Sequence, residues 1–164
     1  MKIKSESIVA LAAIFVSIAT LFVYLYQAHI MQKQQITSVW PYVQWGYTNS
    51  PDGVYIQVEN KGIGPAIVKN VTVKMNGESF NSFKEVFEAL GDTTSQDYIY
   101  SRIGGQVIAP GEKLQPFYIE DWKKGEEHLE KMQQRSFEYT ICYCSVYGDC
   151  WTTYGRKVVE GECR

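Results

Sequence analysis

Residues 8–26 read IVALAAIFVSIATLFVYLY and contain no charged residue, proline or glycine. A helix of this length rises about 28 Å at roughly 1.5 Å per residue, close to the ~30 Å hydrocarbon core of a bilayer. Each Ile, Leu, Val or Phe in it favours insertion by about 0.3–0.6 kcal/mol. The stretch therefore predicts a transmembrane helix, and everything after it reads as one polar domain.

Three features favour an uncleaved signal anchor over a cleavable signal peptide. The apolar run is longer than the roughly 7–15 residues typical of a signal peptide, and no small-x-small cleavage site follows it. Tyr24 and Tyr26 suit the membrane–water interface, where amphipathic rings collect. A buried helix of a soluble protein would normally carry a polar stripe, and this run has none.

Flanking positive charge predicts the orientation of the anchor. Lys2 and Lys4 precede the run, whereas the first fixed positive charge after it is Lys33. The positive-inside rule therefore predicts a single-pass cell membrane protein with a cytoplasmic N-terminus and a periplasmic or extracellular C-terminal domain. The expected organisation is a cytoplasmic tail at 1–7, the anchor at 8–27, a juxtamembrane stalk at 28–38 and a β-sandwich domain at 39–164.

The charge of the domain excludes one class of partner. From residue 28 onward the chain has 14 Lys and Arg against 17 Asp and Glu, and the two signs are interleaved. A nucleic-acid-binding domain needs a positive field, which this domain lacks. The expected partners are therefore the lipid bilayer and a membrane or envelope protein, with a homo-oligomer as one form of that contact, and no nucleic acid.

The residue pattern of the domain is mainly that of β-strands. Residues 54–59 alternate between apolar and polar side chains, and Asn76-Gly77 is typical of a two-residue hairpin turn. A bulge is expected at Lys69-Asn70, and Pro116 is expected to interrupt its strand. The expected strands are 39–47, 54–59, 66–75, 113–120, 137–147 and 150–159.

One or two short helical insertions are expected between the strands, since residues 124–135 read as a helix or a turn. At 82–90 apolar residues recur at helical spacing, with Ser82 as the N-cap and Gly91 as the stop. Residues 124–135 form a charged amphipathic stretch in which Glu127 and Lys131 are an i,i+4 pair. The predicted fold is mainly β, with an N-terminal transmembrane helix followed by an Ig-like antiparallel β-sandwich.

Three stretches of the domain resemble known bacterial proteins. VENKGIGPAIVKNVTV at 58–73 is similar to the N-x-G-x-G-x-A strand–turn–strand of bacterial Ig-like surface domains, which include the CARDB-like adhesion modules. IAPGEKLQPFYI at 108–119 resembles the turn before a later strand of the same class. ICYCSVYGDCW at 141–151 looks like the last hairpin of uncharacterised single-pass membrane proteins with such a domain.

The resemblance implies a sandwich fold and a bacterial envelope location. It implies no catalytic or ligand-binding residue. The helical insertion at 82–90 departs from a minimal Ig sandwich, so the strand order stays open.

Cys142, Cys144, Cys150 and Cys163 all lie in the last 23 residues. An even number of cysteines on the extracytoplasmic side favours two disulfides over free thiols. The spacing of the cysteines is not that of a structural zinc site, so no metal or cofactor is expected. Cys142 and Cys144 share one face of a strand and are poorly placed to bond to each other. The preferred pairing is Cys144–Cys150 with Cys142–Cys163, and the exchanged pairing is the alternative. A strict two-residue turn at Gly148-Asp149 would put Cys150 on the wrong face, so the preferred pairing needs a longer loop or a bulge.

The other candidate sites are surfaces. Trp40, Tyr42 and Trp45 form a candidate binding surface, although their mixed parity favours core and rim positions over one flat platform for sugars. His29 and His128 are expected to be solvated. A stripe of small residues along the anchor would let another helix approach closely in lipid. It comprises Ala10, Ala13, Ser17 and Thr20.

No catalytic site is readable in the sequence, and no enzyme activity is expected. The expected function is that of an envelope protein whose sandwich mediates protein–protein contact, as an accessory or sensor subunit of a membrane system. A cell-wall glycan-binding module that uses the exposed aromatic residues is the alternative. A thiol- or metal-handling envelope protein is a weaker alternative.

Overall fold

A computed structural model of the chain describes residues 5–91 and 98–163. It divides into two compact units, Met1–Ser38 and Val39–Arg164. The boundary falls where the sequence analysis placed the start of the domain.

The first unit is the helix α1, Ser5–Thr37, which is long and apolar enough to cross a membrane. None of its described residues is buried. The Ser17 and Thr20 hydroxyls donate to the carbonyl oxygens of Ala13 and Val16 at 2.8 and 2.7 Å, so the helix itself satisfies these polar groups. The long apolar N-terminal helix is confirmed. It continues through the stalk to Thr37, because no Pro or Gly interrupts it.

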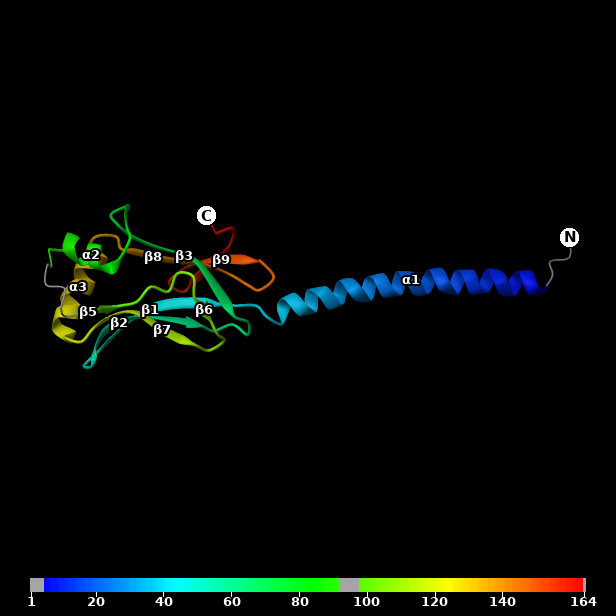
Figure 1. Ribbon diagram of the computed structural model, residues 1–164, viewed down its shortest axis with the longest axis horizontal. Helices are drawn as coiled ribbons and strands as arrows, with labels where there is room; N and C mark the ends of the chain where they lie inside the picture. Colours follow the sequence, from blue (N-terminus) through cyan, green and yellow to red (C-terminus); the bar gives the residue numbers. More distant parts are fainter. Residues whose placement is uncertain (1–4, 92–97, 164) are drawn as a thin grey trace. The chain divides into compact units, whose positions relative to one another are not determined.

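The second unit contains two antiparallel sheets that form two layers (Figure 1). The first sheet contains, in order, β1 (Val43–Ser50), β2 (Gly53–Asn60), β7 (Lys113–Ile119) and β5 (Tyr98–Tyr100). The second contains, in order, β10 (Lys157–Glu160), β9 (Cys150–Tyr154), β8 (Glu138–Cys144), β3 (Ala66–Met75) and β4 (Glu78–Phe80). A further short strand, β6 (Val107–Ile108), also pairs with β3. The mainly β fold is confirmed.

The core lies between the two sheets. The alternation in β2 places Val54, Ile56 and Val58 inward, and none of them is more than 2% exposed. From the other sheet, Val68 and Ile141 are equally buried. Burial of each such side chain contributes roughly 1.5–3 kcal/mol, so the period-two pattern is what holds the layers together.

The helices α2 (Phe83–Ala89) and α3 (Trp122–Gln134) lie together at one end of the sandwich (Figure 1). Ser82 caps α2 as predicted, because its hydroxyl accepts a hydrogen bond from the Glu85 amide at 3.4 Å. Phe87 is fully buried and stacks on Phe117 at 5.1 Å between ring centroids. The predicted Glu127–Lys131 ion pair is present at 2.6 Å.

The structure corrects three strand predictions. Residues 39–42 are not in a strand, and β1 begins at Val43. The expected strand at 150–159 is two strands, because Gly155 with φ 69° turns the chain back on itself. Pro116 does not interrupt β7, since the strand absorbs it as a bulge opposite Gln57. The bulge expected at Lys69-Asn70 is confirmed by a register shift between β3 and β8.

Candidate functional site

Both disulfides of the preferred pairing are present. Cys142–Cys163 has a Cα–Cα distance of 5.6 Å and Cys144–Cys150 one of 4.0 Å. The β8–β9 connection is the loop 145–149, which puts Cys144 directly opposite Cys150. The mismatch of faces that a two-residue turn would create therefore does not arise.

The two disulfides lie close together. The sulfurs of Cys144, Cys150 and Cys163 are within 4.8 Å of one another, and Cys144 Sγ is 3.8 Å from Cys163 Sγ. Thiolates are the form of cysteine that binds metals, and these sulfurs are oxidised. The cluster could hold a metal only after both bridges were reduced.

The three aromatic residues of the candidate binding surface do not form one surface. The Trp45 ring packs edge-on against Tyr47 at 5.5 Å and Tyr139 at 5.3 Å, on the core face of β1. Trp40 is 43% exposed and contacts Tyr42 at 5.1 Å. Trp45 packs against Tyr139 of the core, whereas Trp40 and Tyr42 pair with each other ahead of β1, so a flat platform of three rings is not available.

His128 is buried, which corrects the prediction of a solvated side chain. It is 5% exposed, its Nδ1 lies 2.7 Å from the Lys124 carbonyl oxygen, and its ring packs 5.0 Å from Phe87. Gly125, His128 and Met132 form the buried stripe of α3 at helical spacing. The helical spacing of these three residues is the sequence signal from which the burial of His128 could have been predicted.

His29 is exposed on α1, as expected. The small-residue stripe is exposed as well, and its contact with another helix stays a prediction.

Asn60 explains the N-x-G-x-G-x-A stretch. Its amide is fully buried and makes four hydrogen bonds, accepting from the Tyr42 and Gly62 amides and donating to the Gly64 and Ile108 carbonyl oxygens at 2.8–3.1 Å. A Cβ on Gly62 or Gly64 would collide with the backbone at 39–42. The motif therefore fastens the chain where it enters the sandwich, which is a structural role.

Three tyrosines lie along the line where β1 meets β8. The Tyr143 hydroxyl accepts a hydrogen bond from the Val43 amide at 3.1 Å and so joins the two sheets. Burial raises the pKa of Tyr143 to about 12, although the hydrogen bond from Val43 acts in the opposite direction. Burial also raises the pKa values of Tyr47 and Tyr139 above their usual 10.0. All three side chains are therefore neutral at physiological pH.

The feature that sequence reasoning missed is a cleft of about 590 Å³ between the sheets. It is lined by residues 69–71 and Val73 of β3, by the segment 81–83 at the start of α2, by the segment 100–104 at the end of β5 and after it, and by Tyr139. Its volume lies in the range of small-ligand sites. No local motif marks it, because its walls come from segments far apart in the sequence.

The cleft is basic and partly apolar. Lys69 and Arg102 are both exposed, and the described lining residues include no acidic side chain. Phe83 and Ile103 add buried apolar surface, being 6% and 2% exposed. The arrangement can receive a negatively charged group beside an apolar one.

Comparison with known proteins gives one result. No curated protein and no solved structure matches the chain. A family model described as "Domain of unknown function (DUF8453)" matches residues 7–159. The match includes both the apolar helix and the β-sandwich. The chain therefore belongs to the DUF8453 family.

Proposed function

We propose that the protein is a membrane-anchored envelope protein whose β-sandwich makes protein–protein contact, as an accessory or sensor subunit of a membrane system. The observation that carries this proposal is an antiparallel sandwich with two disulfides that follows a helix of bilayer length. The proposal assigns no enzyme activity to the chain.

The proposed location is the outer side of the cell membrane. Lys2 and Lys4 favour a cytoplasmic N-terminus. Disulfides persist in oxidising compartments such as the periplasm and the extracellular space. The two arguments rest on different residues and support the same orientation.

The strand order supports an Ig-like, CARDB-like assignment of the sandwich. The order β1-β2-β7-β5 corresponds to the ABED sheet of an Ig domain, and β3-β8-β9 corresponds to its CFG sheet. β4 then adds an edge strand beside β3. Fold alone does not define function, which depends on the residues of the contact surface.

Glycan binding stands second in this proposal. Trp45 packs against the core, which leaves the exposed Trp40 beside a half-buried Tyr42. Thiol or metal handling stands third, because all four cysteines are paired in disulfides.

The test is crosslinking in intact cells. A membrane-impermeant crosslinker is applied to cells that carry the tagged full-length chain, and the protein is purified in detergent. The control keeps residues 1–38 and replaces 39–164 with an unrelated secreted domain. We expect a discrete crosslinked membrane protein with the full-length chain and none with the control. Equal crosslinking of both chains, or retention on peptidoglycan without any protein partner, would contradict the proposal.

A further inference from the structure

The outer edge of β3 is only partly covered. β4 pairs with Val73–Met75, and β6 pairs with Ala66-Ile67. Val68 donates to the Gln106 carbonyl oxygen at 2.9 Å and accepts from the Gly105 amide at 3.0 Å. Between these two contacts lies a gap, in which Val71 pairs with no strand on this side in the part of the chain that the structure describes.

The backbone of Val71 faces this gap. β3 and β4 are joined by Asn76-Gly77, whose φ values are 52° and 83°, so Met75 and Glu78 form the hydrogen-bonded pair that flanks a two-residue turn. Backbone groups alternate in direction along an antiparallel strand. Val73 and Val71 therefore direct their N–H and C=O groups to the same side as Met75, away from β8.

The gap opens on the basic cleft. Lys69 and Val71 line both the gap and the cleft, and Arg102 lies on the facing segment. An unpaired strand edge is a template for another extended chain, and main-chain bonds at such an edge are a known mode of peptide recognition. The two exposed cations add a preference for negative charge.

We propose that an acidic, extended segment of a partner protein adds as a strand along residues 69–72, in the gap between β4 and β6. It bonds to the backbone of Val71 and sets a carboxylate between Lys69 and Arg102. At about 3.3 Å per residue the gap spans roughly 13 Å, which suits three to five residues of the partner. This inference rests on the proposed function and identifies the chemistry of its partner.

The first test is residue-resolved hydrogen exchange of the full chain in detergent micelles, with acetyl-Glu-Val-Glu-Thr-Glu-Val-amide as the probe. In the free protein, we expect the Val71 amide to exchange at least 10-fold faster than the Thr72 amide, because Thr72 pairs with β8. Saturating peptide should slow the exchange of Val71 at least 10-fold. Protection of Val71 in the free protein would overturn the proposal, because the edge would already be occupied.

Two control peptides separate charge from strand pairing. Replacement of every glutamate by lysine should weaken binding at least 10-fold, and N-methylation of alternate peptide amides should do the same. Equal binding of either control would overturn the proposal. Binding of succinate with no change at Val71, together with no binding of the hexapeptide, would assign the cleft to small anions instead.

Charge-reversal variants locate the site. Lys69→Glu and Arg102→Glu should each weaken binding of the acidic peptide at least 10-fold. Arg156→Glu is the matched control, because Arg156 is exposed on the β9–β10 turn and does not line the cleft. An equal loss for all three variants would indicate a general charge effect and would overturn the proposal.

The crosslinking experiment then distinguishes failure of the strand-addition inference from failure of the proposed function. If the double variant Lys69→Glu/Arg102→Glu crosslinks the same partner as fully as the wild type, the strand-addition inference falls and the proposed function stands. If the wild type crosslinks no partner, the proposed function falls as well.

Discussion

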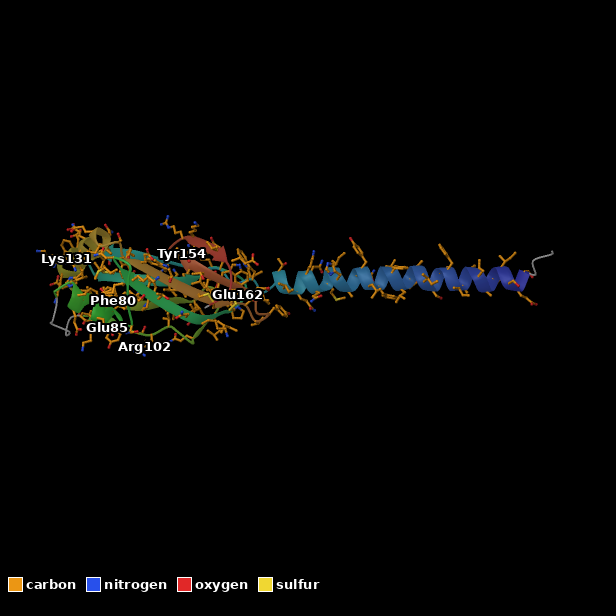
Figure 2. All side chains as sticks on the ribbon, turned by 90° about the horizontal axis from the view of Figure 1, so that it is seen from above. Phe80, Glu85, Arg102, Lys131, Tyr154 and Glu162 are labelled. Carbon is orange, nitrogen blue, oxygen red and sulfur yellow. A yellow bond between two sulfur atoms is a disulfide. The ribbon has the colours of Figure 1, made fainter. Side chains whose placement is uncertain are left out.

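Along one long side of the sandwich, β1 closes the space between the sheets against β9 and β10. The Trp45 amide donates to the Gly155 carbonyl oxygen at 3.1 Å, and the Gln44 side chain donates to the Arg156 carbonyl oxygen at 3.1 Å. Along the other side, β5 and the β3–β4 edge leave the cleft between them. Figure 2 shows Tyr154 on one of these sides and Phe80, Glu85 and Arg102 on the other.

The difference between the closed and the open side indicates that one contributes to stability and the other to binding. The closed side joins the sheets through hydrogen bonds and packed aromatic rings. On the open side, Val71 pairs with no strand along its outer edge among the described residues, and Lys69 and Arg102 are exposed. We therefore expect perturbations of the closed side to change the free energy of unfolding, and surface changes on the open side to change binding.

The largest effect is expected from alkaline pH, which acts on the three buried tyrosines of the closed side. The pKa of Tyr143 is about 12 in the folded state against 10.0 for an ordinary tyrosine, and the pKa values of Tyr47 and Tyr139 are also raised. Their contribution to stability is full below pH 10 and is lost as the pH rises through 12, because the unfolded chain ionises first. Circular dichroism and tyrosinate absorbance at 295 nm should change together. Ionisation of all tyrosines near pH 10 with the sheet signal intact would contradict this.

The next largest loss of stability is expected when the aromatic packing of α2 against β5 and β7 is removed. Phe87 is fully buried and its ring lies 4.9 Å from Tyr98 and 5.1 Å from Phe117. Phe87→Ala should lower the free energy of unfolding by about 3–5 kcal/mol, because it leaves a cavity. Denaturant unfolding of the full chain in micelles measures this. The control Glu88→Ala, on the exposed face of α2, should change it by less than about 0.5 kcal/mol.

Loss of the Cys142–Cys163 disulfide should lower the free energy of unfolding somewhat less. Cys142–Cys163 encloses these strands with a sequence separation of 21, so Cys163→Ser should lower the free energy of unfolding by about 2–4 kcal/mol. A thiol assay should find one free thiol, from Cys142. The double variant Cys142→Ser/Cys163→Ser should have no free thiol and a similar loss of stability. Reaction of all four cysteines in the oxidised wild type would contradict the disulfide assignment.

The smallest effect on stability is expected at the cleft. Lys69 and Arg102 are exposed, so the two reversals to glutamate should together change the free energy of unfolding by about 0.5 kcal/mol or less. The same denaturant experiment measures this. A loss of unfolding free energy comparable to that of Phe87→Ala would show that Lys69 and Arg102 stabilise the fold. It would contradict the contrast between the two sides.

Local signals predicted much of the fold. The uncharged run at 8–26, the alternation at 54–59, the Asn76-Gly77 turn and the Ser82 cap each depend on residues within a few positions of one another. Their outcomes in α1, β2, the β3–β4 hairpin and α2 follow from backbone periodicity and turn chemistry. The observed disulfides also agree with the preferred pairing. The pairing depends on the loop 145–149, which sets Cys144 opposite Cys150.

The sequence by itself determined a bilayer-length helix followed by a mainly β domain, because hydrophobic length and period are properties of neighbours along the chain. Tertiary structure alone decided which sheet edges meet, that the partner of His128 in the core is Phe87, and that Lys69 and Arg102 line one cleft. These features join segments tens of residues apart. They depend on strand order, which the alternation within any one strand does not encode.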